Sequence, residues 1–142
     1  MTLAATAAPV AADAPCSSAF EVACAPDRSR VRCLRQITSA YLDLWDLTGS
    51  AADDVVIAVS ELVSNAVLHG RGDVSLRIRY IGPELRIEVT DANPAPAELR
   101  KANDDEDSGR GLLLVAGLAQ DWGVTNGGRT TWCRFGVPTG RP

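Results

Sequence analysis

Two neighbouring runs of alternating apolar and polar residues constrain the fold of this chain most strongly. The apolar positions of these runs are Val74, Leu76, Ile78 and Tyr80, then Leu85, Ile87 and Val89. Ile81-Gly82-Pro83 separates the runs, and this pattern predicts an antiparallel hairpin with one apolar face. Such a face has to be covered, so other elements of the chain must pack against it.

Helical and strand periodicities on both sides of the hairpin supply these elements. In chain order they predict a strand over 20–25, a helix from Pro26 to Trp45, a helix over 53–69, a helix over 112–119, and strands over 122–125 and 130–137. Ser50 and Asp53 resemble a capping box before the second helix, and Gly70 is expected to end it as a left-handed residue. Residues 94–108 are polar and predict a long mobile loop, which in a compact domain is usually functional.

Length and charge exclude several classes of protein. The 142 residues predict one domain over 19–138, with a disordered tail over 1–18 and a short tail over 139–142. With 14 Lys and Arg against 18 Asp and Glu, the formal charge is −4, so we expect no direct binding to nucleic acid or to an anionic membrane. No apolar run reaches the roughly 18 residues of a membrane span. Four irregularly spaced cysteines predict free thiols in a reducing cytoplasm.

Polar side chains interrupt the apolar surface of the second helix. Glu61 and Asn65 lie four residues apart on one side, and His69 continues their line one turn later. A buried carboxylate needs a metal, a ligand or a hydrogen-bonded cleft. The alternatives are that Glu61 pairs with an arginine at the surface and that His69 is a helix-terminal residue favoured by the helix dipole.

Two further positions are candidates for chemistry. Period two places Asp91 on the inward face that Leu85 and Val89 occupy, although Asp91-Ala92-Asn93-Pro94 is also typical of an Asx turn. Ser108-Gly109-Arg110-Gly111 at a helix start is suited to an anion, because glycines admit the backbone closely and helix N–H groups are free there. Glycines are also common at helix starts without any ligand.

These three features, in this order, resemble the Bergerat-fold (GHKL) ATPases, and among them the small serine kinases that act as anti-sigma factors. The matching segments are Glu61 to Val67, Asp91 to Pro94, Ser108 to Val115, and the closing pair Trp122-Gly123-Val124 and Gly127 to Trp132. The resemblance implies a two-layer α+β sandwich whose sheet is mixed but mostly antiparallel, with helices on one face. It also implies ATP and Mg²⁺ as cofactors.

The resemblance implies a role for each matching residue. Glu61 would be the catalytic general base, and Asn65 would hold Mg²⁺ through its side-chain oxygen. Asp91 would accept a hydrogen bond from the adenine amino group, with Asn93 in the same nucleotide-binding set. The phosphates would be lined by Gly109, Arg110, Gly111 and Leu112. Thr131 would support the adenine side, because it shares a face with Cys133, Phe135 and Val137, whereas Thr130 does not.

Two residue choices depart from the family. Asn93 stands where the family usually has glycine, and asparagine tolerates unusual backbone angles. The residues before Ser108 are acidic (Asp104, Asp105, Glu106, Asp107), where kinases of this type often carry a basic residue.

The function implied is an ATP–Mg²⁺-dependent serine/threonine protein kinase that phosphorylates an anti-sigma-factor antagonist and sequesters a sigma factor. The alternative is a non-catalytic ATP-binding module whose partner affinity is gated by nucleotide. A histidine kinase is disfavoured, because no dimerisation helix carries a phosphorylatable histidine. Family members commonly dimerise and bind partners near their first helix, here the segment with Arg28, Arg30, Arg32 and Arg35. That segment could equally be a solvated basic face.

Overall fold

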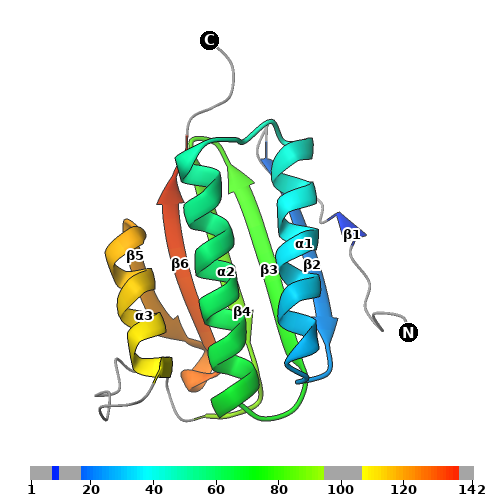
Figure 1. Cartoon of the computed structure of the whole chain (residues 1–142), viewed down its shortest axis with the longest axis vertical. Helices are drawn as coiled ribbons and strands as arrows, with labels where there is room; N and C mark the ends of the chain where they lie inside the picture. The colour runs from blue at the N-terminus through cyan, green and yellow to red at the C-terminus, as the bar shows by residue number, and fades with distance from the viewer. Residues whose placement is uncertain (1–7, 10–16, 95–106, 138–142) are drawn as a thin grey trace.

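One antiparallel sheet and one layer of helices make up the part of the chain that the computed structural model describes, residues 8–9, 17–94 and 107–137 (Figure 1). The six strands have the order β1-β2-β3-β4-β6-β5. Their bounds are β1 Ala8–Pro9, β2 Ser17–Cys24, β3 Val74–Ile81, β4 Glu84–Thr90, β5 Asp121–Thr125 and β6 Thr130–Gly136. The predicted α+β sandwich is confirmed, and all pairs among the described strands are antiparallel, where the prediction allowed a mixed sheet.

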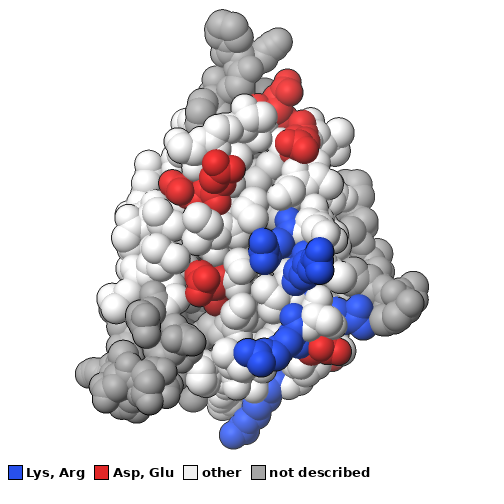
Figure 2. Space-filling view, viewed as in Figure 1, with Lys and Arg blue, Asp and Glu red and all other residues white. Residues whose placement is uncertain are grey.

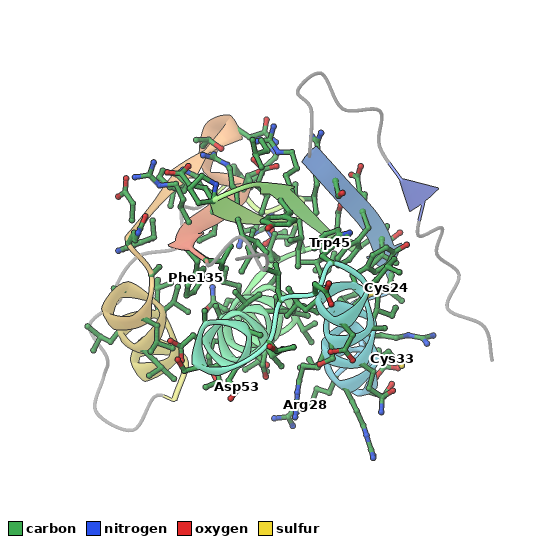
Figure 3. The ribbon with its side chains drawn as sticks, turned by 90° about the horizontal axis from the view of Figure 1, so that it is seen from above. Cys24, Arg28, Cys33, Trp45, Asp53 and Phe135 are labelled. Atoms are coloured by element: carbon green, nitrogen blue, oxygen red, sulfur yellow. The ribbon has the colours of Figure 1, made fainter. Side chains whose placement is uncertain are left out.

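Three helices cover a single face of this sheet, as the view from above shows (Figure 3). They are α1 Ser29–Leu44, α2 Ser50–His69 and α3 Asp107–Leu118, and the short 3-10 helix η1 Asn126–Gly128 joins β5 to β6. The helix α2 lies in the middle of the layer, between α1 and α3, and contacts β3, β4 and β6. Its fully buried Val55, Val59 and Val63 lie at four-residue steps and form the centre of the core.

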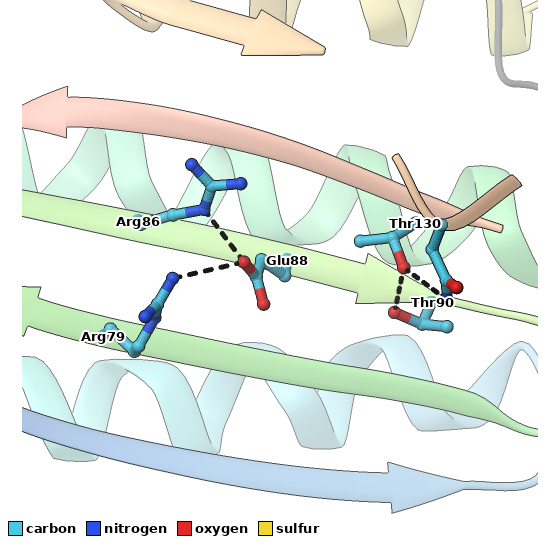
Figure 4. A network of polar contacts seen from close by, with 6 residues as sticks. Arg79, Arg86, Glu88, Thr90 and Thr130 are labelled. Atoms are coloured by element: carbon cyan, nitrogen blue, oxygen red, sulfur yellow. Dashed lines mark hydrogen bonds and ion pairs between the residues drawn. The ribbon is translucent and has the colours of Figure 1, made fainter. Parts of the chain in front are cut away.

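The hairpin of β3 and β4 has the predicted one-sided character. Leu76, Ile78 and Ile87 are fully buried beneath the helices. On the opposite face, the Glu88 carboxylate lies 2.9 Å from Arg86 Nε and 3.4 Å from Arg79 Nη2 (Figure 4). The Arg86 guanidinium lies 4.3 Å from the centroid of the Trp132 ring. Glu88 therefore pairs with two arginines on the uncovered face, and such partly exposed pairs add about 0–1 kcal/mol each.

Aromatic rings attach α1 to the sheet. The rings of Phe20 in β2 and Tyr41 in α1 are stacked with centroids 4.2 Å apart, and Trp45 stacks at 5.7 Å on Tyr80 of β3. Such pairs contribute roughly 0.5–1.5 kcal/mol beyond their buried area. Tyr41 and Trp45 therefore pack on the sheet, whereas Leu44, three residues after Tyr41, is 73% exposed. The helix begins at Ser29 rather than at Pro26.

Two local predictions are wrong. Ser50 is the first residue of α2, not its cap; Gly49 holds the N-cap position at φ +85°, and no side chain caps the helix. The predicted tail over 1–18 contains strand residues, because Ser17 and Ser18 pair with Ile81 and Tyr80 and continue the ladder of β2. The remainder of that tail, residues 95–106 of the predicted loop with the acidic run 104–106, and the tail over 139–142 lie outside the described residues.

The cysteines and the helices bear on two further predictions. Cys24, Cys33 and Cys133 are free thiols, as predicted for these three, and burial raises the pKa of Cys133 to about 12. Within the described ranges, no helix combines the length and the apolar character that a membrane crossing requires.

Candidate functional site

The C-terminal half of α2 brings the predicted polar line to one end of the sheet. Leu62 and Ala66 are buried and fix the helix against the strands, which leaves Glu61 and Asn65 half-buried beside them. His69 is exposed at the last turn. The helix therefore presents its polar line at the edge of the core, where a cleft forms, rather than within the core.

Asp91 follows directly on β4 and is held in a tight turn. Its own N–H donates to the Arg129 carbonyl at 3.0 Å, and the next N–H, of Ala92, donates to the Arg71 carbonyl at 2.7 Å. Its Oδ1 accepts the N–H of Asn93 at 2.6 Å, which is the Asx turn expected as one alternative. Asp91 also lines a pocket, so both interpretations of this residue hold together.

Gly70 is a glycine for a steric reason, not for the conformation that the sequence suggested. Its φ is −87°, an extended rather than a left-handed angle, so the predicted left-handed end of α2 is wrong. A Cβ at this position would lie 2.5 Å from both Cγ and Oδ2 of Asp91. The missing side chain therefore allows the Asp91 carboxylate to approach the end of α2.

The neighbouring threonines of β6 lie on opposite faces of the sheet, as period two predicts. Thr131 is buried on the helix side and lines the same pocket as Asp91. Thr130 faces away, and its Oγ1 lies 2.8 Å from the Oγ1 of Thr90 (Figure 4). The preference for Thr131 over Thr130 as the inward residue is therefore correct in its geometry.

The pocket joins the end of α2, the turn after β4 and the start of β6. Its walls are Leu62, Asn65, Ala66, His69, Gly70, Val89, Asp91, Asn93, Gly128 and Thr131. It encloses about 20 Å³, which is room for about one water molecule and far less than the roughly 300–1,000 Å³ of a ligand site. A ligand the size of a purine therefore requires these walls to separate.

Sequence reasoning missed part of this pocket. Gly70 and Gly128 line it, and neither was a predicted site residue. The sequence contained a signal that Gly70 belongs to the site. Leu62, Ala66 and Gly70 follow one another at four-residue steps, so they lie on one side of the helix, and their side chains become smaller toward its end.

The third predicted segment lies in the first turns of α3. This helix begins at Asp107, so Gly109 is in its first turn, where backbone N–H groups have no partner within the helix. The Arg110 side chain lies outside the described residues. Leu112 is buried in the core and does not line the pocket.

Gly111 brings α3 into contact with Glu61 of α2. A Cβ at Gly111 would overlap Oε1 of Glu61, so the carboxylate rests directly on the glycine backbone. Glu61 is therefore next to the start of α3, while Asn65, one turn later on α2, lies in the pocket wall. The three sequence features meet around the C-terminal half of α2.

The acidic groups do not form a metal site by themselves. Among the described residues, no group of three or more His, Cys, Asp and Glu side chains is arranged to hold a metal ion. Asn65 offers one amide oxygen. This fits a cation such as Mg²⁺, which keeps several waters and takes its other ligands from phosphate groups.

Two glycines of α3 provide a matched test of the Glu61 contact. Gly117 has nothing within 4 Å of a Cβ, so Gly117→Ala should raise the unfolding free energy by about 0.5–1 kcal/mol, the gain from replacing glycine in a helix. Gly111→Ala should lower it by about 1–3 kcal/mol, because the methyl group overlaps the carboxylate. Chemical denaturation measures both. Equal stabilisation by the two substitutions would contradict the contact.

The comparisons with known proteins agree with this geometry. Residues 24–135 match the family model of the histidine kinase-like ATPase domain. No curated protein matches the chain. The matched range covers most of the sequence and contains α1, α2, α3, β4 and all of β6 except its last residue. This domain type implies nucleotide binding. The chain therefore belongs to the histidine kinase-like ATPase domain family.

Proposed function

We propose that the protein is an ATP–Mg²⁺-dependent serine/threonine protein kinase of the anti-sigma-factor type. The single observation that carries the proposal is the meeting of Asp91, Asn65 and Thr131 in one pocket, in a domain of the ATPase family. Glu61, which contacts Gly111 of α3, precedes the pocket residue Asn65 by one helical turn and supports the proposal.

The residues present fit an adenine nucleotide. Asp91 Oδ2, beside Gly70, is the acceptor for the adenine amino group, and the Thr131 hydroxyl supports the same side of the base. Buried Val89 and Leu62 supply apolar contacts for the ring. The base enters as the walls of the narrow pocket separate.

The side of the pocket toward α3 would hold the phosphates and Mg²⁺. Asn65 would be the protein ligand of the ion, and the free N–H groups of the first turn of α3 would bind phosphate oxygens near Gly109. Bound Mg²⁺ neutralises charge on the transferring phosphoryl group, so the chain's own contribution is mainly to position the reactants.

Glu61 takes the proton from the acceptor hydroxyl. Its half-buried carboxylate is one helical turn before Asn65 and outside the base pocket, where it would face bound phosphates. The only histidine of the sequence, His69, lines that pocket at the end of α2. In this proposal the acceptor is the serine or threonine hydroxyl of a partner, the anti-sigma-factor antagonist.

The partner surface is the arginine stripe of α1, defined as Arg28, Arg32 and Arg35. These residues follow one another at four- and three-residue steps and therefore lie on one side of the helix. Arg32 and Arg35 line a groove of about 780 Å³ whose α2 wall is Val56. Basic side chains gather over this side of the molecule (Figure 2). The groove suits an acidic segment of a sigma factor or of its antagonist.

Nucleotide binding is tested first, by titration calorimetry with ATP and Mg²⁺. Asp91→Asn should weaken ATP binding about tenfold or more, because it removes a charged acceptor. Thr131→Val should weaken it about threefold to tenfold. Thr130→Val is the matched control, since this neighbour faces the other side of the sheet, and it should bind like the parent. No heat from the parent protein would overturn the proposed function.

Phosphoryl transfer is tested with labelled ATP and candidate antagonist proteins. Glu61→Ala should reduce transfer of label by about a hundredfold or more while ATP binding persists, because it removes the general base. Glu61→Gln controls for the loss of volume and should be equally defective. A parent protein that never transfers label, yet changes its partner affinity with ATP, would instead be the non-catalytic module.

Partner binding is tested with substitutions of two arginines, one in the helix layer and one on the uncovered face of the sheet. Arg35→Gln should weaken partner binding at low salt, with a smaller effect at high salt, because it removes one charge from the arginine stripe. Arg77→Gln makes the same change of charge on β3 and should have no effect. Surface plasmon resonance over a series of salt concentrations measures both. Equal losses for the two variants would exclude α1 as the partner surface.

A further inference from the structure

Asn93 ties the turn after β4 to the end of α2. Its side-chain Nδ2 donates to the main-chain oxygen of His69 at 2.8 Å. Its main-chain N–H donates at the same time to Oδ1 of Asp91 at 2.6 Å. Asn93 and His69 both line the pocket, so this connection crosses from one of its walls to another.

This residue is not present for its backbone angle. Among the described residues other than glycine, only Asp46 and Asn126 have positive φ, so Asn93 does not use the left-handed conformation that asparagine tolerates. The expectation that it replaces a family glycine by adopting unusual angles is therefore wrong. What asparagine adds here is a side-chain donor, which a glycine cannot supply.

Both of these Asn93 bonds act on the Asp91 carboxylate. Oδ1 is engaged by the Asn93 N–H, while Oδ2 lies against Gly70 at the end of α2. His69 immediately precedes Gly70. The His69–Asn93 bond therefore fixes the distance between Gly70, which contacts Oδ2, and the Asn93 N–H, which binds Oδ1. A carboxylate held at one oxygen and confined at the other offers its remaining lone pairs in a fixed direction.

We propose that Asn93 is a positioning residue that orients Asp91 and thereby sets the selectivity of the pocket for a base with an exocyclic amino group. The proposal rests on the proposed nucleotide binding and deepens it. ATP carries an amino group that donates to Asp91, whereas ITP carries an oxygen at that position and cannot. Loss of the Asn93 side chain should therefore weaken ATP binding and leave ITP binding nearly unchanged.

The experiment is titration calorimetry of the full chain with ATP and with ITP, each with Mg²⁺. The parent should bind ATP more tightly than ITP. Asn93→Ala should reduce the ratio of the ITP to the ATP dissociation constant by about threefold to tenfold, the range for loss of one supporting hydrogen bond. The matched control is Asn126→Gly. It also removes one side-chain bond, 3.3 Å to Thr130, at a positive φ that glycine adopts freely, and it should keep the parent's ratio.

A second measurement does not depend on nucleotide. In the parent protein, the Asn93 side-chain amide should give a proton resonance that exchanges slowly with solvent, as expected for an amide bonded to the His69 carbonyl. A rapidly exchanging amide would overturn the proposal even if Asn93→Ala failed to fold.

The outcomes separate the two proposals. A parent that binds no ATP overturns both. A parent that binds ATP through Asp91, with an unchanged ATP to ITP ratio in Asn93→Ala, overturns only the role of Asn93. If Asn126→Gly reduced the ratio of the two dissociation constants as much as Asn93→Ala does, the role of Asn93 would also be overturned. The effect would then follow from general destabilisation.

Discussion

The packing of α2 across the centre of a one-sided sheet is the constraint on which the rest of the structure depends. Fully buried Val55, Val59 and Val63 fix the axial position and rotation of this helix. That rotation places Glu61 against α3 and Asn65 in the pocket wall, while the length of the helix brings Gly70 to Asp91. The position of the site therefore follows mainly from the packing of α2 in the core.

The patterns that predicted the fold correctly are local and periodic. Apolar residues alternate along β3 and β4 and recur at helical spacing in α2. Because each pattern is repeated over many residues and most of these apolar residues are buried in the core, the tertiary contacts agree with the local pattern. The same periodicity identified Thr131 as the inward threonine. Features decided by one residue were less predictable: Ser50 does not cap α2, because Gly49 occupies the cap with a backbone angle that sequence alone does not reveal.

The parts of the site that could not be predicted depend on contacts between segments far apart in sequence. The glycine at position 70 has the appearance of a helix-ending residue, and only its distance from Asp91 shows its steric role. Likewise, Asn93 suggests a bend with unusual backbone angles, yet its side chain donates to the main-chain oxygen of His69 on another element. The small volume of the pocket depends on all its walls together and has no sequence signature.

The pleat of β6 has a consequence for how this domain can vary. Thr130 and Thr131 are adjacent, yet one lies under the helices and the other on the open side. Inserting or deleting one residue at the beginning of the strand would exchange them and also turn Cys133 and Phe135 out of the core. Length changes there are consequently far more damaging than substitutions, and natural variation in length should be confined to the connections between elements.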